Sequence, residues 1–371
     1  MGRAACSIEQ KTVTTMSDTI LELESITKSF DGKVILDDLN LKIYKNEFIT
    51  LLGPSGCGKS TLLRIIGGFV HPDRGRVLYN GQDITNLPPD KRNLHTVFQK
   101  YSLFPHYNVR DNIAFGLKLK KKSKAYIDDK VDYALHLVNM EGFEERRPDS
   151  LSGGQQQRVA IARAIVNEPD VLLLDEPLGA LDLKLRRGMQ RELMKIKREV
   201  GITFIYVTHD QGEALTMSDR IIVMNQGYVQ QMGDPRSIYD EPQNAFVADF
   251  IGESNIIDGI MVRDCLVRIQ GHEVTCVDTG FEENEPVDVT IRPEDLTIVG
   301  VSDGFVRGTV TDVIYEGAYY DIRMRDELDY EWQIQSVTAA VPGSQVGLSI
   351  LPENIQIMHK PRTSAEEAVR E

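Results

Sequence analysis

Continuous apolar runs, each followed by polar residues and then by a helical pattern, mark the first 240 residues of the chain. They occupy residues 48–52, 171–174 and 203–207. A strand that is buried on both faces of a parallel sheet has this appearance, because neither of its faces meets solvent. The repeated order of strand, polar loop and helix therefore predicts an α/β fold.

The segments around these runs follow other patterns. From Ile20, the stretches "ILELESITKSF" and "VILDDLNLKI" alternate apolar and polar residues, which predicts antiparallel edge strands. Residues 105–165 have mostly helical spacing, and the lysine-rich stretch 118–124 within them is interpreted as a solvated helix end or loop in preference to a phosphate or lipid contact. After Pro242, short β-rich segments separated by turn signals predict a small barrel.

Length and charge divide the chain into two parts. Its 371 residues are too many for one comfortable core, and the formal charge of −14 is unevenly placed. Residues 241–371 hold 25 Asp and Glu against 9 Lys and Arg, a balance of −16, which leaves +2 for residues 1–240. This split predicts a domain boundary near residue 240. Because an acidic tail repels phosphate backbones, nucleic-acid binding is not expected there.

The cysteines and the chain ends indicate a reduced compartment. Four cysteines are too few for a disulfide scaffold, and none forms a C-x-x-C metal pair. They are Cys6, Cys57, Cys265 and Cys276. The last two are either neighbours on paired strands or small buried apolar residues. Residues 1–18 lack the apolar core of a secretory signal and are expected to be disordered, with Met16 as an alternative start. No apolar run approaches the length of about 18 residues that a membrane span needs, so the chain is not expected to cross a bilayer.

A glycine-rich motif predicts a phosphate site. Residues 53–60, "GPSGCGKS", match G-x-x-x-x-G-K-[ST] between the strand at 48–52 and the helical run "TLLRII". Backbone N–H groups and a helix N-terminus would surround the phosphates of a nucleotide, Lys59 would reach the β- and γ-phosphates, and the Ser60 hydroxyl would bind Mg²⁺. The loop alone names no reaction, because kinases, GTPases and recombinases share it. Asp175, at the end of "VLLLD", is the expected second Mg²⁺ anchor. The predicted ATP-binding residues of this loop are Gly53, Pro54, Ser55, Gly56, Cys57, Gly58, Lys59, Ser60 and Thr61. A chance glycine-rich turn is the alternative, which the strand and helix context disfavours.

A second anion-binding helix start follows at "LSGGQ", residues 151–155. One nucleotide does not need two such sites on the same chain. The pattern therefore favours a head-to-tail dimer, with each ATP between residues 53–60 of one subunit and residues 151–155 of its partner. The simpler alternative is a helix that Ser152 caps.

These motifs, in this order, resemble those of the nucleotide-binding subunits of ABC transporters. The resemblance rests on the phosphate loop, "LSGGQ" and "VLLLDEP", and on Gln99 in "VFQ", Asp182 in "GALD" and His209 in "VTHD". It covers about residues 20–371. It implies a P-loop ABC ATPase domain over residues 19–240 with a helical subdomain at about 100–165. An OB-like domain of the TOBE type is implied for residues 241–371.

The resemblance also implies roles for single residues. Glu176 would be the general base for an attacking water, because it directly follows the Mg²⁺-side Asp175; a surface glutamate is the alternative. His209 would contact the γ-phosphate and orient the water. Gln99 would couple the Mg²⁺ and water site to the membrane partners and contribute to the metal site, and Phe30 would stack on adenine or else pack in the strand core. The predicted contacts to the partner subunit's ATP come from Ser152, Gly153, Gly154, Gln155 and Asp182, of which Asp182 is also a candidate helix N-cap.

The aromatic segment 101–117 suggests a surface that docks against a helix, and the family resemblance implies that this helix belongs to the permease. The expected contacts are Phe104, Pro105 and Phe115, with core packing as the alternative. The C-terminal "VTIRPEDL" at 289–296 resembles the accessory barrel of importers. Within them, the segments around "HTVFQKYSLFPH" and "LSGGQ" look most like the spermidine/putrescine branch, which implies a homodimer, two integral-membrane permease subunits and an extracytoplasmic binding protein. The chain would then lie peripherally at the cytoplasmic face of the membrane.

Other functions are compatible with parts of this pattern. The same motor could serve a sugar, glycerol-phosphate, phosphonate or ferric ion importer. A non-transport ABC ATPase would need two cassettes or a long coiled-coil insertion, and the chain has neither. An oligonucleotide-binding barrel would need basic residues, whereas Lys360 is the single lysine after residue 240. Two departures from the family pattern, Gly67 and Gly212, are expected to affect helix stability by roughly 1 kcal/mol or less and not the chemistry.

Overall fold

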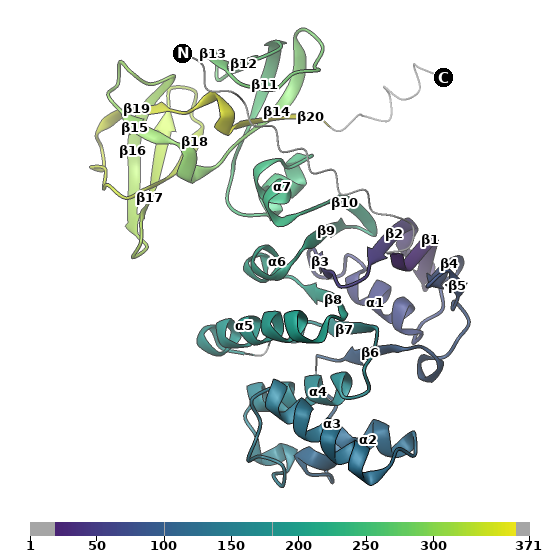
Figure 1. The fold of residues 1–371 in the computed structure, drawn as a ribbon. Helices are drawn as coiled ribbons and strands as arrows, with labels where there is room; N and C mark the ends of the chain where they lie inside the picture. Colours follow the sequence, from purple (N-terminus) through teal and green to yellow (C-terminus); the bar gives the residue numbers. More distant parts are fainter. Residues whose placement is uncertain (1–18, 100, 180, 361–371) are drawn as a thin grey trace, which may run out of the picture. The chain divides into compact units, whose positions relative to one another are not determined.

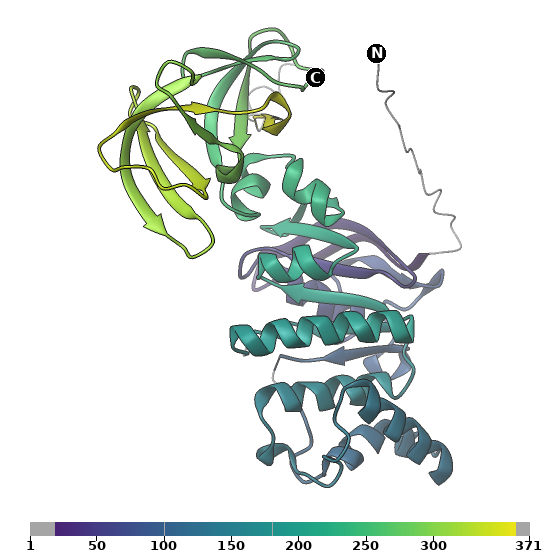
Figure 2. The same cartoon turned by 60° about the vertical axis from the view of Figure 1, so that its left-hand side comes forward.

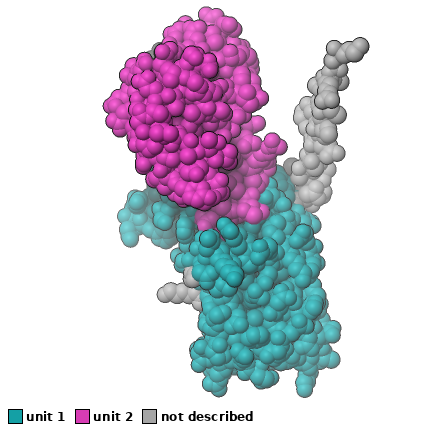
Figure 3. Space-filling model, turned by 90° about the vertical axis from the view of Figure 1, so that its left-hand side faces the viewer, with its two compact units in different colours: residues 1–209, 217–219, 225–228 teal, residues 210–216, 220–224, 229–371 magenta. Residues whose placement is uncertain are grey.

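The computed structural model describes residues 19–99, 101–179 and 181–360 (Figure 1). The expected disorder of residues 1–18 and the alternative start at Met16 lie outside the described residues. The chain forms two compact units, coloured separately in Figure 3. Unit 1 comprises residues 1–209, 217–219 and 225–228, and unit 2 comprises residues 210–216, 220–224 and 229–371. The domain boundary predicted near residue 240 stays a prediction.

Unit 1 begins with an antiparallel sheet whose strand order is β2-β1-β4-β5. Its strands are β1 (Thr19–Phe30), β2 (Lys33–Tyr44), β4 (Arg74–Tyr79) and β5 (Gln82–Asp83). The alternating sequence puts Leu21 and Leu23 of β1 in the core, where Leu21 pairs with Tyr79 and Leu23 with Val77 of β4. The antiparallel strands predicted from the alternation are confirmed, with β2 at the edge of the sheet and β1 between β2 and β4.

A run of parallel strands in the order β3-β8-β7-β6 forms the centre of unit 1. Its strands are β3 (Phe48–Leu52), β8 (Thr203–Thr208), β7 (Val171–Asp175) and β6 (Leu94–Val97). Every residue of β3, β7 and β8 is buried. This confirms the strands predicted from the three apolar runs. Because the strands are parallel, the polar residues that follow β6, β7 and β8 meet at one edge of the sheet, the carboxyl edge.

The helices of unit 1 complete the α/β arrangement (Figures 1 and 2). They are α1 (Lys59–Gly67), α2 (Val109–Leu119), α3 (Lys124–Leu137), α4 (Gly153–Ile165) and α5 (Leu183–Val200), with short 3₁₀ turns at Pro89–Lys91 and Pro148–Ser150. Helices α2, α3 and α4 pack on one another, as expected for a helical subdomain. The lysine-rich stretch 118–124 covers the end of α2, the connecting loop and the start of α3, as the interpretation as a solvated helix end or loop expects.

Unit 2 contains most of the segment from α6 to α8, followed by two antiparallel sheets. The helices are α6 (Gln211–Met217), α7 (Pro235–Asp240) and α8 (Ala245–Phe250), and the strands between them are β9 (Arg220–Asn225) and β10 (Tyr228–Gly233). One sheet has the order β13-β12-β11-β14-β20. Its strands are β11 (Asn255–Arg263), β12 (Leu266–Ile269), β13 (His272–Thr275), β14 (Glu285–Ile291) and β20 (Ile355–His359).

The second sheet of unit 2 has the order β15-β19-β16-β17-β18. Its strands are β15 (Thr297–Val299), β16 (Val306–Tyr315), β17 (Tyr320–Asp326), β18 (Glu331–Ser336) and β19 (Gln345–Ser349), with 3₁₀ turns at Pro293–Asp295 and Pro352–Asn354. Both sheets contribute to one apolar core around the fully buried Trp332, whose Nε1 donates to Asp326 Oδ2 at 2.9 Å. Asn255 ties β11 to the other sheet, because its Nδ2 donates to the Gln333 carbonyl at 2.8 Å. The strand-rich C-terminal domain predicted from the sequence is confirmed.

The described residues contain no helix that is long and apolar enough to span a membrane. In the same part of the chain Cys57, Cys265 and Cys276 are free thiols, and Cys6 lies outside it. The backbone N–H of Cys276 donates to the Cys265 carbonyl at 3.2 Å, so the two cysteines are neighbours directly beyond the paired strands β12 and β13. Cys276 is buried, and Cys265 is partly exposed. Gly67 also has a packing role, because a Cβ at this position would lie 2.9 Å from the Phe69 ring.

Candidate functional site

The predicted phosphate loop connects β3 to α1 in a glycine-dependent conformation. Gly56 and Gly58 have φ angles of 81° and 107°. A Cβ on Gly58 would lie 2.8 Å from Leu36 Cδ2, so the loop passes too close to β2 for a side chain there. No side chain caps the start of α1, which leaves its first N–H groups directed at the loop. The loop therefore offers backbone donors and a helix N-terminus to an anion.

Lys59 folds back over this loop. Its Nζ donates to the carbonyls of Gly53 at 2.7 Å and Pro54 at 2.9 Å, and the side chain is 5% exposed. A buried ammonium requires such acceptors, because an unpaired charge is costly away from water. The two carbonyls hold the ammonium inside the loop, at the place where phosphate oxygens are expected.

Ser60 connects the loop to the end of β7. Its hydroxyl donates to Asp175 Oδ1 at 2.8 Å, and Asp175 is 8% exposed. The sequence predicted both residues as Mg²⁺ anchors although they are 115 positions apart. A hydroxyl and a carboxylate in contact form the kind of oxygen pair that Mg²⁺ uses together with substrate phosphates.

Glu176 is the centre of a second polar cluster at the carboxyl edge. Its Oε2 accepts from Gln99 Nε2 at 3.3 Å, and its Oε1 lies 3.3 Å from His209 Nδ1. The three residues come after β6, β7 and β8, so the parallel register brings them together as the sequence analysis expected. Glu176 remains 25% exposed on its side chain and can reach a solvent water.

The backbone of Glu176 is a feature that the sequence did not reveal. Its φ angle is 45°, in the left-handed region that non-glycine residues rarely adopt, and its N–H donates to the Val207 carbonyl at 3.0 Å. The bond to β8 holds the residue in this conformation. A strained backbone at the candidate base fixes the direction of its carboxylate, as observed at other functional sites.

The "LSGGQ" segment forms the capped start of α4. The Ser152 side chain accepts from the Gln155 N–H at 3.4 Å, while Gln155 Oε1 accepts from the Ser152 N–H at 3.0 Å. This reciprocal pair is a capping box. Asp182 caps α5 with a single hydrogen bond, its Oδ1 accepting from the Leu185 N–H at 2.9 Å. The capping roles considered for both residues are confirmed, whereas the contacts of Ser152, Gly153, Gly154, Gln155 and Asp182 with a partner's ATP stay predictions.

Phe30 lies at the end of β1 with its ring in solvent. The side chain is 45% exposed, and the Lys28 ammonium lies 5.2 Å from the ring centroid. This exposure excludes the packing of Phe30 in the strand core. The ring is available for stacking on a planar base, which is the role that the family resemblance implies.

The expected permease surface is an aromatic cluster between β6 and α2. The Phe104 and Phe115 rings have centroids 4.5 Å apart, and both are half-buried, while Pro105 is exposed. Asn112 holds the segment in place: it is fully buried, and its side-chain oxygen accepts from the Phe104 N–H at 2.8 Å. The guanidinium of Arg163 lies 5.3 Å from the Phe104 ring centroid. The cluster is therefore a rigid surface with partly exposed rings.

Arg92 is a positioning residue that the sequence analysis missed. It is 6% exposed, and its Nη1 donates to the carbonyls of Ile65 at 2.9 Å and Ile66 at 2.6 Å, at the end of α1. Burial lowers the pKa of this guanidinium, but the cation interacts favourably with the negative end of the helix. Arg92 thus anchors the helix that begins at the phosphate loop. A single arginine before a strand gives no signal of this role in the sequence.

The chain resembles known protein families over both of its parts. Residues 36–179 match the ABC transporter family, and residues 289–358 match the TOBE domain. The "Spermidine/putrescine import ATP-binding protein PotA" of Acetivibrio thermocellus is 58% identical over 94% of this chain and 99% of its own length. The protein of the same name from Desulfitobacterium hafniense is 56% identical over 93% of this chain and 99% of its own length.

Two solved structures resemble the chain more coarsely. One is cbiO1 from Clostridium perfringens, which is part of the ABC transporter complex cbiONQ. It matches with a TM-score of 0.57 at 33% identity, covering 60% of this chain and 90% of that one. A dimeric ATP-binding cassette in a post-hydrolysis state, bound to ADP and Pi, has a TM-score of 0.53 at 34% identity, covering 58% of this chain and 99% of that one. The expected α/β fold with an accessory β domain is confirmed.

Proposed function

Because this chain belongs to the family of ATP-binding subunits of ABC transporters, we propose that it hydrolyses ATP to energise the import of spermidine and putrescine. The match to polyamine-import proteins over nearly the full length of both chains carries this proposal. It favours polyamines over a sugar, glycerol-phosphate, phosphonate or ferric ion as cargo. It equally disfavours a non-transport ATPase, since the accessory domain is shared as well.

The ATP phosphates bind in the loop of residues 53–60, with Lys59 against the β- and γ-phosphates. The Ser60 hydroxyl and the Asp175 carboxylate would hold Mg²⁺ beside the phosphates. The donor set supports this assignment, because the two oxygens are already in contact at 2.8 Å. When bound, the metal supplies positive charge that stabilises the charge developing on the γ-phosphate.

Hydrolysis depends on the cluster around Glu176. Its carboxylate accepts the proton of the attacking water, while His209 orients the water and contacts the γ-phosphate. Gln99 contributes to the metal site and couples this site to the membrane subunits. The contacts of 3.3 Å that Glu176 makes with both side chains support a shared role. A positioned base of this type contributes about 10²–10⁴ in rate.

Two copies of the chain act together in a head-to-tail homodimer. The amino end of α4 at Ser152 and of α5 at Asp182 would contact the ATP held by the partner subunit. The N–H groups of the first turn of each helix support this role, because helix N-termini favour anions. The side chains of Ser152 and Asp182 cap the helices and would keep these N–H groups directed outward.

The dimer operates in a complex with two integral-membrane permease subunits, to which an extracytoplasmic binding protein delivers polyamine. The chain is peripheral at the cytoplasmic face of the membrane. A permease helix rests on the aromatic cluster of Phe104, Pro105 and Phe115, and the half-buried rings of this cluster support such a contact. No role for nucleic acid is proposed.

Uptake of labelled spermidine and putrescine tests the proposal. Cells would carry the natural chain, Glu176→Gln, or the matched control Glu141→Gln, whose side chain is exposed in unit 1. We expect Glu176→Gln to abolish polyamine uptake and to leave maltose and iron uptake unchanged, while the control behaves as the natural chain. Loss of maltose or iron uptake with normal polyamine uptake would reassign the cargo.

A further inference from the structure

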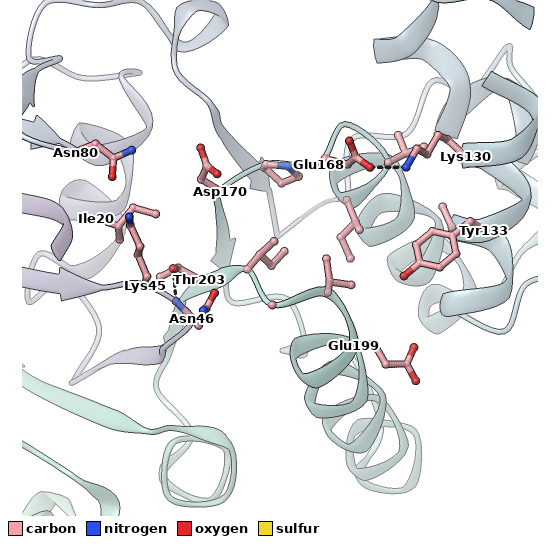
Figure 4. A pocket seen from close by; sticks show the side chains of 17 residues that line it. Ile20, Lys45, Asn46, Asn80, Lys130, Tyr133, Glu168, Asp170, Glu199 and Thr203 are labelled. Carbon is pink, nitrogen blue, oxygen red and sulfur yellow. Dashed lines mark hydrogen bonds and ion pairs between the residues drawn. The ribbon is translucent and has the colours of Figure 1, made fainter. Parts of the chain in front are cut away.

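A cavity of about 600 Å³ lies in unit 1 at the amino ends of the parallel strands (Figure 4). Asp170 and Thr203, which line it, stand at the starts of β7 and β8. Asp175 is five residues further along β7, about 16 Å at the usual rise of a strand. The cavity is thus separated from the nucleotide site by the length of the sheet. It does not belong to the machinery described above.

The floor of the cavity is apolar and buried. Ile165, Val166 and Ile202 line it, with exposed fractions of 3%, 3% and 8%. In Figure 4 the polar rim has two sides, with Lys45 and Asn80 on one and Lys130 and Tyr133 on the other. A volume within about 300–1,000 Å³, an apolar floor and a few polar groups at the rim are typical of small-molecule sites.

The carboxylates of the rim differ in their availability. Glu168 is paired with Lys130. Asp170 accepts from the Tyr79 hydroxyl and, at 2.7 Å, from Asn93 Nδ2, and both donors contact the same oxygen, Oδ2. Within the described part of the chain, no side-chain donor contacts Oδ1 of Asp170, so this oxygen can accept from a ligand. Burial, together with the contact with Asp170, raises the pKa of Tyr79 to about 12, so Tyr79 remains a neutral donor.

Two helices end at the cavity. The last residue of α4, Ile165, and the residues from Glu199 to Gly201 at the end of α5 all line it. The carbonyl ends of helices carry partial negative charge and favour cations. Tyr133, half exposed on α3, adds an aromatic face of the kind that attracts ammonium groups.

Lys45 is the opposing charge. It is exposed in the turn between β2 and β3 and, among the described residues, has no ion pair within 4.0 Å. Its long side chain can move into solvent, whereas the Asp170 carboxylate is held by two hydrogen bonds. Glu168 is paired with Lys130 and Glu199 with Lys195, so the fixed charge that remains for a ligand is the Asp170 carboxylate, and the mobile charge is the Lys45 ammonium.

We propose that this cavity binds an organic ammonium ion that has an apolar body. The ammonium group would donate to Oδ1 of Asp170 and lie near the carbonyl ends of α4 and α5. The apolar body would cover Ile165, Val166 and Ile202. Both helices begin at residues assigned to nucleotide contacts, Ser152 and Asp182, so the bound ion would touch their opposite ends. The binding itself does not depend on the proposed function.

Three probes with the same indole body test the charge preference. They are tryptamine, its neutral analogue tryptophol and the anion indole-3-propionate. Calorimetric titration of the full chain, with saturating ADP present to occupy the nucleotide site, would measure each affinity. We expect tryptamine to bind at least about tenfold more tightly than either analogue, the ratio for one charge-assisted hydrogen bond. Equal binding of the three probes, or no binding of tryptamine, would overturn the proposal.

Substitutions locate the binding. Asp170→Asn should weaken tryptamine about tenfold, since the amide can still accept from Tyr79 but is uncharged. Lys45→Gln should strengthen it by removing the opposing charge. Asp129→Asn, an exposed carboxylate of α3 outside the cavity, is the matched control and should have no effect. If Asp170→Asn does not fold, the affinity of Lys45→Gln for tryptamine tests the location of the site by itself. Unchanged affinity in both cavity variants would place the tryptamine elsewhere and contradict the assignment.

Discussion

The two edges of the β3-β8-β7-β6 sheet carry polar residues in contrasting arrangements. At the carboxyl edge, Ser60 contacts Asp175 at 2.8 Å, and Glu176 contacts His209 at 3.3 Å. At the amino edge, the residues around Asp170 surround an open volume of about 600 Å³. One edge is preorganised for chemistry, and the other offers space above an apolar floor.

The contrast follows from chain direction. In a parallel sheet, every strand delivers the residue after its last position to the same edge, so consecutive loops can build one reactive cluster. The amino edge receives helix ends as well as strand starts, because α4 and α5 return the chain there. It therefore gathers negative helix ends and apolar residues, which suit binding more than catalysis.

The largest difference between the two edges is expected when one carboxylate is neutralised at each of them. Asp175→Asn removes the Mg²⁺ anchor and the acceptor of the Ser60 hydroxyl, so ATP hydrolysis should fall at least about a hundredfold. Asp170→Asn, at the opposite end of β7 and outside the nucleotide site, should leave the hydrolysis rate within about twofold. Phosphate release by the purified chain measures both. Equal losses in the two variants would contradict separate roles for the edges.

Helix α4 connects the two edges, and its amino end can be altered without loss of its cap. Ser152→Asp retains a good N-cap but places a negative charge where the partner's phosphate is expected. Hydrolysis should fall at least about tenfold through charge repulsion, with the free energy of unfolding unchanged within about 0.5 kcal/mol. Urea unfolding and hydrolysis assays on the same preparation separate the two effects. Ser152→Ala is the control that loses the cap, at a cost of about 1 kcal/mol.

At the nucleotide site, Phe30 should affect the binding of ATP and not its hydrolysis. Phe30→Leu keeps an apolar side chain but removes the ring, so ATP affinity should decrease about fivefold, in line with roughly 1 kcal/mol for aromatic stacking. The hydrolysis rate at saturating ATP should be unaffected. Affinities for ATP and for inorganic triphosphate, measured in parallel, test the assignment. A similar loss for triphosphate would show that Phe30 does not act through the base.

His95, in the middle of β6 between the two edges, should affect stability alone. Burial, with a smaller contribution from Lys120, lowers the pKa of His95 to about 4. Because the unfolded chain binds this proton near pH 6.5 and the folded chain only near pH 4, stability falls as the pH decreases through this window. The loss between about pH 7 and about pH 4.5 should be about 2 kcal/mol smaller in His95→Gln. Urea unfolding at both pH values measures it, and equal losses in the two proteins would contradict a lowered pKa of His95.

The sequence predicted the residues of the carboxyl edge but not the cavity at the amino edge. The strands at 48–52, 171–174 and 203–207 were evident because unbroken apolar runs of this length, bounded by polar residues, are typical of buried strands. The carboxyl edge followed because its residues lie in ordered motifs after these strands. The left-handed backbone of Glu176 and the anchoring of α1 by Arg92 depend on long-range hydrogen bonds. The cavity is built from residues between positions 20 and 203 that share no motif. Only folding brings them together.

The most direct test of the central claim concerns Glu176. In the purified Glu176→Gln variant, ATP should still bind, hydrolysis should fall by about 10²–10⁴, and light scattering with ATP should report twice the monomer mass. This result would identify Glu176 as the base and the dimer as the closed state. A variant that remains monomeric with ATP and hydrolyses it at the natural rate would contradict the account.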